Sequence, residues 1–147
     1  MNPAIDMTQL APALAGAAEI LSDPEAFTVR SYAIDGSGRS VEPLSDEATA
    51  WDVVGAVLKC LGLTIDDYHA VEDPRPQDLP TPQPIKKFWV VVTTINVFAT
   101  HRLDGEPPDA SRRSLAVAWL RELATLDAAK IIDCRTATTK WKRWEPI

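Results

Sequence analysis

The sequence has little of what a catalytic or metal centre needs. Its two cysteines, Cys60 and Cys134, lack CxxC spacing, and it contains only two histidines, His69 and His101. Cys60 falls on the apolar side of a predicted helix, so we expect both cysteines to be buried free thiols. The GxSxG pattern of a nucleophile elbow is absent, and two isolated histidines do not supply a ligand set. We therefore predict no catalytic residue, no metal site and no cofactor.

An enzyme stays open as an alternative class. It would be a small hydrolase or transferase in which His69 or His101 acts as the base, with an acidic partner brought close by the fold. His101 stands at the end of a predicted helix, where a partial positive charge is favourable. The acidic residues around His69 are typical of a solvated loop.

Long apolar runs are also missing. No segment reaches the roughly 18 apolar residues of a membrane span, and the first ten residues carry an acidic residue where a secretory signal would have a basic one. With 147 residues, 46% of them hydrophobic, the chain suits one domain over residues 1–147. We expect a cytoplasmic protein that does not contact membranes.

The net charge of −6 argues against general nucleic-acid binding, but the charge is uneven. Residues 128–147 carry five basic and two acidic residues, a net charge of +3, which leaves −9 for the remainder. This basic aromatic tail ends in a run that alternates cations with indole rings: Lys140, Trp141, Lys142, Arg143 and Trp144. It could pack on its own domain, on a second copy in a homodimer or on another protein, or bind single-stranded nucleic acid.

Two helices are predicted in the first half. Residues 10–21 have apolar side chains at helical spacing, and the stretch 41–63 has Ser45 as a cap and Gly62 as a left-handed stop. Gly55 in the middle of the second helix predicts close approach of another backbone, most simply a neighbouring helix. We expect the core to include Trp51, Gly55, Leu58 and Leu61 from this stretch.

Between these helices, residues 27–41 change to β-branched and aromatic residues followed by a glycine-rich turn, which predicts a short hairpin or an extended arm. The Gly-Ser-Gly at 36–38 lacks the third glycine of a dinucleotide loop and the Lys-Ser/Thr of a P-loop. We interpret it as a tight turn.

The order of residues in this half resembles a family of small uncharacterised bacterial and phage proteins. The residues that carry the resemblance are Tyr32, Ala33, Asp35, Gly38, Val41, Pro43, Ala50, Trp51, Gly55 and Ala56. The resemblance covers roughly residues 10–62 and implies a mostly helical fold. It implies no activity and no functional residue.

The second half begins with a proline-rich stretch at 64–84, which predicts a loop or an extended crossover. Residues 85–102 favour a strand by propensity, but apolar residues recur in them at helical spacing over a length too great for an ordinary strand. We predict a helix, with a central strand over 87–99 as the alternative. Asn96, embedded among apolar residues, either satisfies a buried backbone group or contacts a ligand.

A last helix is predicted from Asp109 to about Asp127, with Trp119 in the core. The fold class is therefore mainly α: a small bundle of about four helices with a short hairpin or arm. The function predicted from this pattern is a non-enzymatic protein-interaction or accessory factor with an unknown protein partner. A nucleic-acid accessory protein that uses the tail is the alternative.

Overall fold

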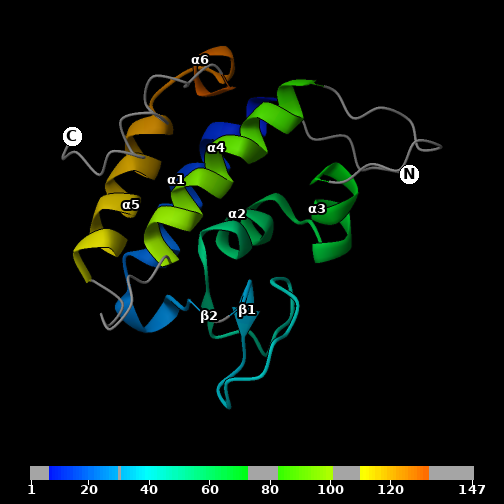
Figure 1. Ribbon diagram of the computed structural model, residues 1–147, viewed down its shortest axis with the longest axis vertical. Coiled ribbons are helices and arrows are strands. Elements are labelled where there is room, and N and C mark those ends of the chain that lie inside the picture. Colours follow the sequence, from blue (N-terminus) through cyan, green and yellow to red (C-terminus); the bar gives the residue numbers. More distant parts are fainter. Residues whose placement is uncertain (1–6, 30, 73–82, 101–109, 133–147) are drawn as a thin grey trace.

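The computed structural model describes residues 7–29, 31–72, 83–100 and 110–132 (Figure 1). Within these ranges the chain forms six α-helices, two 3-10 helices and one two-stranded antiparallel sheet, which confirms the mainly α class. The elements, in chain order, are η1 (Met7–Gln9), α1 (Leu10–Leu21), η2 (Pro24–Ala26), β1 (Ala33–Ile34), β2 (Ala50–Trp51), α2 (Val53–Leu61), α3 (Ile65–Glu72), α4 (Gln83–Thr100), α5 (Ala110–Leu123) and α6 (Ala128–Ile132).

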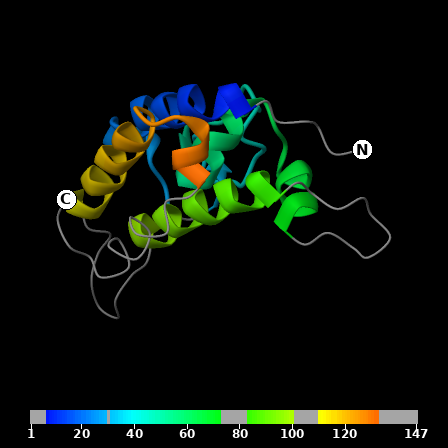
Figure 2. The same ribbon diagram turned by 90° about the horizontal axis from the view of Figure 1, so that it is seen from above.

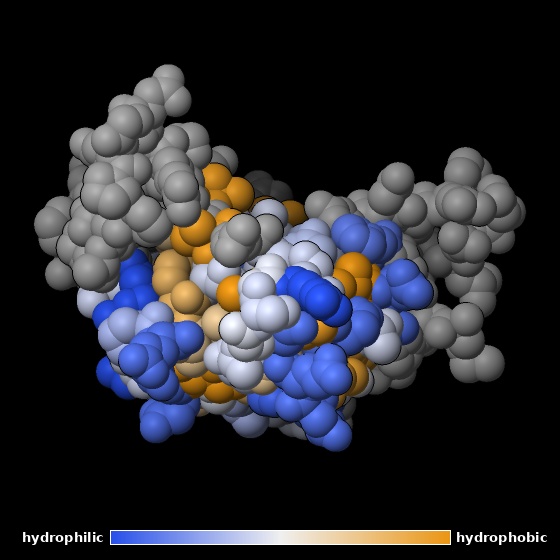
Figure 3. Space-filling model, turned by 90° about the horizontal axis from the view of Figure 1, so that it is seen from below, coloured by the Kyte–Doolittle hydropathy of each residue, from blue (hydrophilic) through white to orange (hydrophobic). Residues whose placement is uncertain are grey.

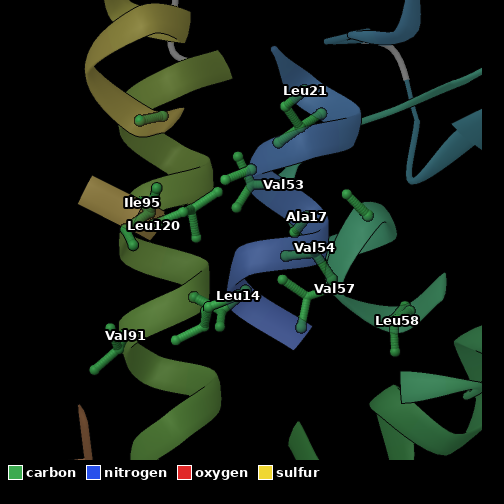
Figure 4. Packing of buried hydrophobic residues seen from close by; sticks show 14 of the residues in the cluster. Leu14, Ala17, Leu21, Val53, Val54, Val57, Leu58, Val91, Ile95 and Leu120 are labelled. Carbon is green, nitrogen blue, oxygen red and sulfur yellow. The ribbon is translucent and has the colours of Figure 1, made fainter. Parts of the chain in front are cut away.

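Four helices make the expected bundle. α1 packs against α2 and α5, and α4 packs against the same two helices, so that α1 and α4 lie on opposite sides of the molecule (Figure 2). Apolar side chains from all four meet in the centre, with Leu14, Val54, Ile95 and Leu120 among them (Figure 4). Each fully buried leucine or isoleucine contributes roughly 1.5–3 kcal/mol. The bundle therefore holds the core.

α4 confirms the predicted helix, and the alternative of a central strand over 87–99 is wrong. Its buried residues follow helical spacing along one face: Phe88, Val91, Val92, Ile95 and Ala99. A helix buries all of these on the same side, whereas a strand would place neighbouring valines on opposite faces. Burial in the bundle thus overrides the β-propensity of the valines and threonines.

α2 ends as expected but begins later than predicted. Gly62 adopts the left-handed conformation with φ of 71°, and its N–H donates to carbonyl oxygens of the last turn. The expected start at Ser45 is wrong, because Ala50 and Trp51 pair with Ile34 and Ala33 as strand β2. The helix begins only at Val53, so half of the predicted helix is loop and strand.

The segment before β2 contains the predicted tight turn. The Asp35 carboxylate accepts hydrogen bonds from the backbone N–H of Ser37 (2.9 Å) and of Arg39 (3.0 Å). Gly38 has a φ of 85°, which favours glycine. The Ser37 hydroxyl also donates a hydrogen bond to this carboxylate. Hydrogen bonds stabilise the charged carboxylate and so lower the pKa of Asp35, and the bond from the Ser37 hydroxyl is the largest cause. β1 and β2 then lie at the end of the molecule opposite α6 (Figure 1).

The neighbour of Gly55 is not a helix, which corrects our expectation. The residue is buried in α2, and a Cβ placed on it would overlap the carbonyl oxygen of Tyr32 and lie 2.7 Å from the carbonyl carbon. The backbone that approaches is therefore the chain entering β1. Gly55 joins the bundle to the small sheet.

Part of the predicted loop at 64–84 is helical. Residues 65–72 form α3, whose first turn is closed by a reciprocal pair: Thr64 N–H donates to Asp67 Oδ2 (2.9 Å) and Asp67 N–H to Thr64 Oγ1 (3.1 Å). Glu42 Oε1 accepts from the Ile65 N–H at 3.1 Å. The prolines start only at Pro74, so they do not restrict this segment. Residues 73–82 lie outside the described ranges.

The predicted tail also begins as a helix. α6 occupies residues 128–132 and packs across one end of the bundle, on α4 and α1 (Figure 2). Its Ile131 is fully buried. Asp127 at its start accepts a hydrogen bond from the Lys130 N–H at 2.9 Å, the pattern of an N-cap. Residues 133–147, with Cys134, lie outside the described ranges.

Cys60 is exposed rather than buried, contrary to the prediction. It lies on the side of α2 that faces α1, where a Cβ placed on Gly16 would lie 2.8 Å from its sulfur. The small residue at 16 leaves room for the thiol at the edge of the contact. Partial burial raises the pKa of the Cys60 thiol, and the neighbouring Lys59 opposes that shift.

Candidate functional site

Asn96 lies where α4 meets the start of α2, and it fills the first of its two predicted roles. Its side-chain oxygen accepts a hydrogen bond from the Val53 backbone N–H at 3.0 Å. Val53 is the first residue of α2, so this N–H has no partner within its own helix. The Asn96 amide also hydrogen-bonds the Asp52 carboxylate. Asn96 thus satisfies buried polar groups at a helix end.

Asp52 completes this junction as the N-cap of α2. One carboxylate oxygen accepts the Gly55 N–H at 2.7 Å, although only 6% of the residue is exposed. Burial raises the pKa of Asp52 to about 7, and the hydrogen bonds from Gly55, Asn96 and Val54 oppose that rise without cancelling it. A carboxyl group with such a pKa titrates near neutral pH. It sits in the structural joint between α2 and α4.

Asn96→Ala is expected to destabilise the protein by about 2 kcal/mol, since it leaves the Val53 N–H and the Asp52 carboxyl without their side-chain partner. Chemical denaturation at pH 7 measures the effect. Val97→Ala is the matched control, because Val97 neighbours Asn96 on α4 but is half exposed, and it should change stability by less than about 0.5 kcal/mol. Equal stability of the Asn96 variant and the wild type would remove the junction as a source of stability.

The predicted base His69 lies on α3 beside a cluster of aromatic rings. The ring centroids of Tyr68 and Tyr32 lie 5.6 Å and 6.0 Å from that of His69. Tyr68 is itself buried, 5.0 Å from the Trp89 ring, and its hydroxyl shares a hydrogen bond of 3.1 Å with Thr93 Oγ1. These contacts hold α3 against α4. His101 lies outside the described ranges, so the structure does not test whether the two histidines converge.

One donor in this cluster is unsatisfied. The indole Nε1 of Trp89 is buried and has no hydrogen-bond partner among the residues that the structure describes. A buried donor without a partner costs roughly 1–3 kcal/mol. The same indole ring packs against Phe88 and Tyr68, whose ring centroids lie 5.3 Å and 5.0 Å from that of Trp89. Ring packing therefore dominates at this position.

The outer face of α4, formed by Val90, Thr94 and Val97, is the most unusual surface of the described residues. Val90 is 60% exposed and Val97 50% exposed. Between them, the Thr94 hydroxyl donates to the Val90 carbonyl oxygen at 2.7 Å, so its hydrogen is used within the helix. The sequence from Phe88 to Thr100 contains no charged residue. A solvent-facing helix surface is ordinarily charged or polar, so this one is a candidate binding surface.

We missed this surface in the sequence because the same segment supplies the buried face. The available signal was the lack of charge at the positions opposite Phe88, Val92 and Ile95, where an amphipathic helix normally places Lys or Glu. The spacing of Val90, Thr94 and Val97, four and then three residues, places them on one side of the helix.

The end of the molecule that carries β1 and β2 has a different kind of surface. In the view from the side of the sheet, polar and apolar residues are interspersed (Figure 3). Leu44, in the loop between β1 and β2, is 42% exposed and has acidic residues nearby in the chain at Glu42, Asp46 and Glu47. This end therefore lacks the uncharged stretch found on α4.

Other predicted residues fall into two groups. Trp51, Gly55, Leu58 and Trp119 are buried, and Leu61 is half-buried against the core. Trp51 also donates through Nε1 to the Pro43 carbonyl oxygen at 3.1 Å, and Lys59 Nζ lies 4.7 Å from its ring centroid. Outside the described ranges lie the residues proposed for the basic tail and the second histidine: Lys140, Trp141, Lys142, Arg143, Trp144 and His101.

Within the described ranges, two features that the alternatives would need are absent. These residues contain no group of three or more His, Cys, Asp or Glu side chains placed to hold a metal ion. Among them, no helix has both the length and the apolar character needed to cross a bilayer.

Comparison with known proteins adds no relative: no protein-family model, no curated protein and no solved structure matches this chain. The resemblance over residues 10–62 therefore stays a prediction that rests on the residues named for it. The candidate surface has to be judged on its own geometry.

Proposed function

We propose that this protein is a non-enzymatic interaction factor that binds a partner protein through the outer face of α4. The observation that carries the proposal is the combination of exposure and lack of charge at Val90, Thr94 and Val97. Exposed apolar side chains are common singly, but here two valines line one stripe and the hydroxyl between them donates to the helix itself.

The driving force is burial of the two valines. Each exposes roughly half of its surface, so covering both contributes on the order of 2 kcal/mol. No charged group has to be desolvated on this stripe, which removes the main cost of burying a protein surface. A partner with an apolar ridge or groove suits it, for example one face of an amphipathic helix.

α4 is also well placed to act as a rigid platform. Its inner face is fixed in the bundle by Phe88, Val92 and Ile95, and Asn96 ties it to α2. A partner that binds the outer face therefore meets a preorganised surface and has to order little of it.

The test is a paired set of variants. Val90→Asp/Val97→Asp places two charges on the outer face of α4 and is expected to weaken capture of a specific partner from cells by at least tenfold. Leu44→Asp makes the same chemical change at an exposed leucine elsewhere and should leave capture unchanged. Quantitative mass spectrometry of the co-purified proteins measures both, with circular dichroism to verify that each variant is folded. Equal capture by the double variant and the wild type would contradict the proposal.

A further inference from the structure

We infer that Asp52 is a pH-sensitive switch: its protonated carboxyl keeps the β arm, residues 31–51, closed on the helical bundle, and ionisation of this carboxyl lets the arm open. The β arm comprises β1, the tight turn and β2, and it lies at one end of the bundle (Figure 1). The inference does not depend on the proposed function, which concerns the outer face of α4.

Asp52 is the point at which the β arm, α2 and α4 meet. It follows β2 directly and is the N-cap of α2. Its backbone N–H donates to the Tyr32 carbonyl oxygen of the arm at 3.3 Å. Its carboxylate accepts hydrogen bonds from the Gly55 N–H in α2 and from the Asn96 amide in α4. One residue therefore connects all three parts of the structure.

The closed arm keeps water away from this carboxylate. Asp52 is buried, and the Tyr32 carbonyl lies so close to Gly55 that a Cβ there would overlap it. A buried charge costs free energy unless an opposite charge pairs with it. The groups that oppose the effect of burial on Asp52 are neutral hydrogen-bond donors of Gly55, Asn96 and Val54. The ionised carboxylate is therefore stabilised when the arm moves away and admits water.

The β arm is the part that can move away from Asp52. β1 and β2 pair over two residues each, and the arm contributes Ala33 and Trp51 to the buried core cluster. The larger share of that cluster comes from α1, α2, α4 and α5. Local opening occurs in segments that few buried apolar contacts hold in place. The arm should therefore open before the bundle unfolds.

The elements around Asp52 bring in one other residue type that ordinarily changes charge between pH 5 and pH 8. On α4, the sequence from Phe88 to Thr100 contains no charged residue. The ionisable side chains on α1, η2 and α2 are exposed: Glu19, Glu25, Lys59 and Cys60. In the arm, the Tyr32 ring lies 6.0 Å from the ring of His69 on α3, measured between centroids. Because histidine ordinarily titrates near neutral pH, His69 needs a test of its own.

The size of the effect follows from the linkage between opening and proton binding. Burial raises the pKa of Asp52 to about 7 in the closed form, from an ordinary value of 3.8 that it regains in water once the arm opens. Between these values the open form has lost a proton that the closed form keeps, so the equilibrium constant for opening rises about tenfold per pH unit. Because the rise ends near pH 7, the constant should increase about 100-fold from pH 5 to pH 8.

Amide hydrogen exchange of the full chain, followed by NMR from pH 5 to pH 8, tests the inference. Protection factors, which correct for the intrinsic pH dependence of exchange, should fall about 100-fold for the N–H groups of Asp52 and Gly55. At pH 8 these two amides should also be about tenfold less protected than those of Ala17 in α1 and Leu120 in α5. Equal protection of all four at pH 8 would mean that Asp52 acts only on unfolding of the whole domain, and would overturn the inference.

Two variants identify the group that titrates. Asp52→Asn keeps an oxygen that can accept the Gly55 N–H but does not ionise, so the protection of Gly55 should change by less than about twofold over the same pH range. His69→Gln removes the imidazole and should retain the fall seen in the wild type. A fall that persists in Asp52→Asn, or that is lost in His69→Gln, would overturn the inference. The comparison of amides within the wild type decides whether the opening is local even if a variant does not fold.

Discussion

Gly55→Ala is expected to destabilise the protein by at least about 4 kcal/mol, a large part of the 5–15 kcal/mol typical of a whole domain. A Cβ at this position would overlap the carbonyl oxygen of Tyr32 and would stand 2.7 Å and 3.2 Å from its carbonyl carbon and Cα. All three are backbone atoms, so a side-chain rotation cannot relieve the overlap.

The consequences extend beyond the overlap itself. The same Tyr32 carbonyl oxygen accepts the Asp52 N–H at 3.3 Å, and Asp52 caps α2 through the Gly55 N–H. Moving β1 away from α2 therefore disturbs the cap as well as the sheet. Alanine is favoured over glycine within a helix by about 1 kcal/mol, which is too little to compensate.

Two other glycines serve as controls for Gly55→Ala. Gly36→Ala should change stability by less than about 0.5 kcal/mol, because no described atom beyond the two neighbouring residues lies within 4 Å of the added Cβ. Gly62→Ala also has space, but its φ of 71° should cost about 1–2 kcal/mol. Urea denaturation of the three variants measures the order of their free energies of unfolding. If Gly55→Ala were no less stable than Gly62→Ala, the close approach of β1 would be wrong.

The sequence predicted the elements whose pattern is local. α4 could be recognised because its buried face repeats from Phe88 to Ala99, about three turns, and Gly62 because a left-handed stop needs only one residue. The start of α2 could not be read in this way. Ser45 and Asp52 are both good caps by type. The pairing of Ala50 with Ile34 and of Trp51 with Ala33, 16 and 18 positions away in the chain, decides between them.

α3 was missed although its signal is present in the sequence. Thr64 and Asp67 have the spacing of a capping box, and the structure forms both of its hydrogen bonds. The prolines that follow from Pro74 onward led us to assign the entire segment to a loop. A proline restricts its own residue and the one before it, so it gives no evidence about residues ten positions earlier.

The candidate surface shows a different limit. The sequence identified which residues of α4 are apolar, but burial of the inner face is decided by α2 and α5, which pack on it. Only with these neighbours in place do Val90 and Val97 remain exposed. The role of Asn96 has the same origin, since its partner Val53 lies 43 residues away in the chain.

Lowering the pH from 7 to 4 is expected to stabilise the protein through Asp52. The pKa of this carboxyl rises from 3.8 to about 7 on folding, mainly because of burial. Between these values the folded protein binds a proton that the unfolded chain has lost, so the free energy of unfolding falls as the pH rises. About three pH units at 1.36 kcal/mol each give a contribution of about 4 kcal/mol from this group, which is absent above pH 7.

Asp52→Asn should remove this dependence. Asparagine keeps a side-chain oxygen that can accept the Gly55 N–H and is a good N-cap, but it carries no titrating group. The variant should therefore be more stable than the wild type at pH 8, where the wild type holds a buried charge, and the two should converge near pH 4.

Asp67→Asn is the matched control at the start of α3, where the carboxylate accepts the Thr64 N–H, and it should retain the slope of the wild type. Asp35 does not affect this comparison. Its pKa is lowered on folding, so its contribution to the free energy of unfolding is lost only below about pH 4. Urea denaturation at half-unit steps from pH 4 to pH 8 measures all three proteins. The same slope in Asp52→Asn and the wild type would show that another group, and not the N-cap of α2, carries the pH dependence.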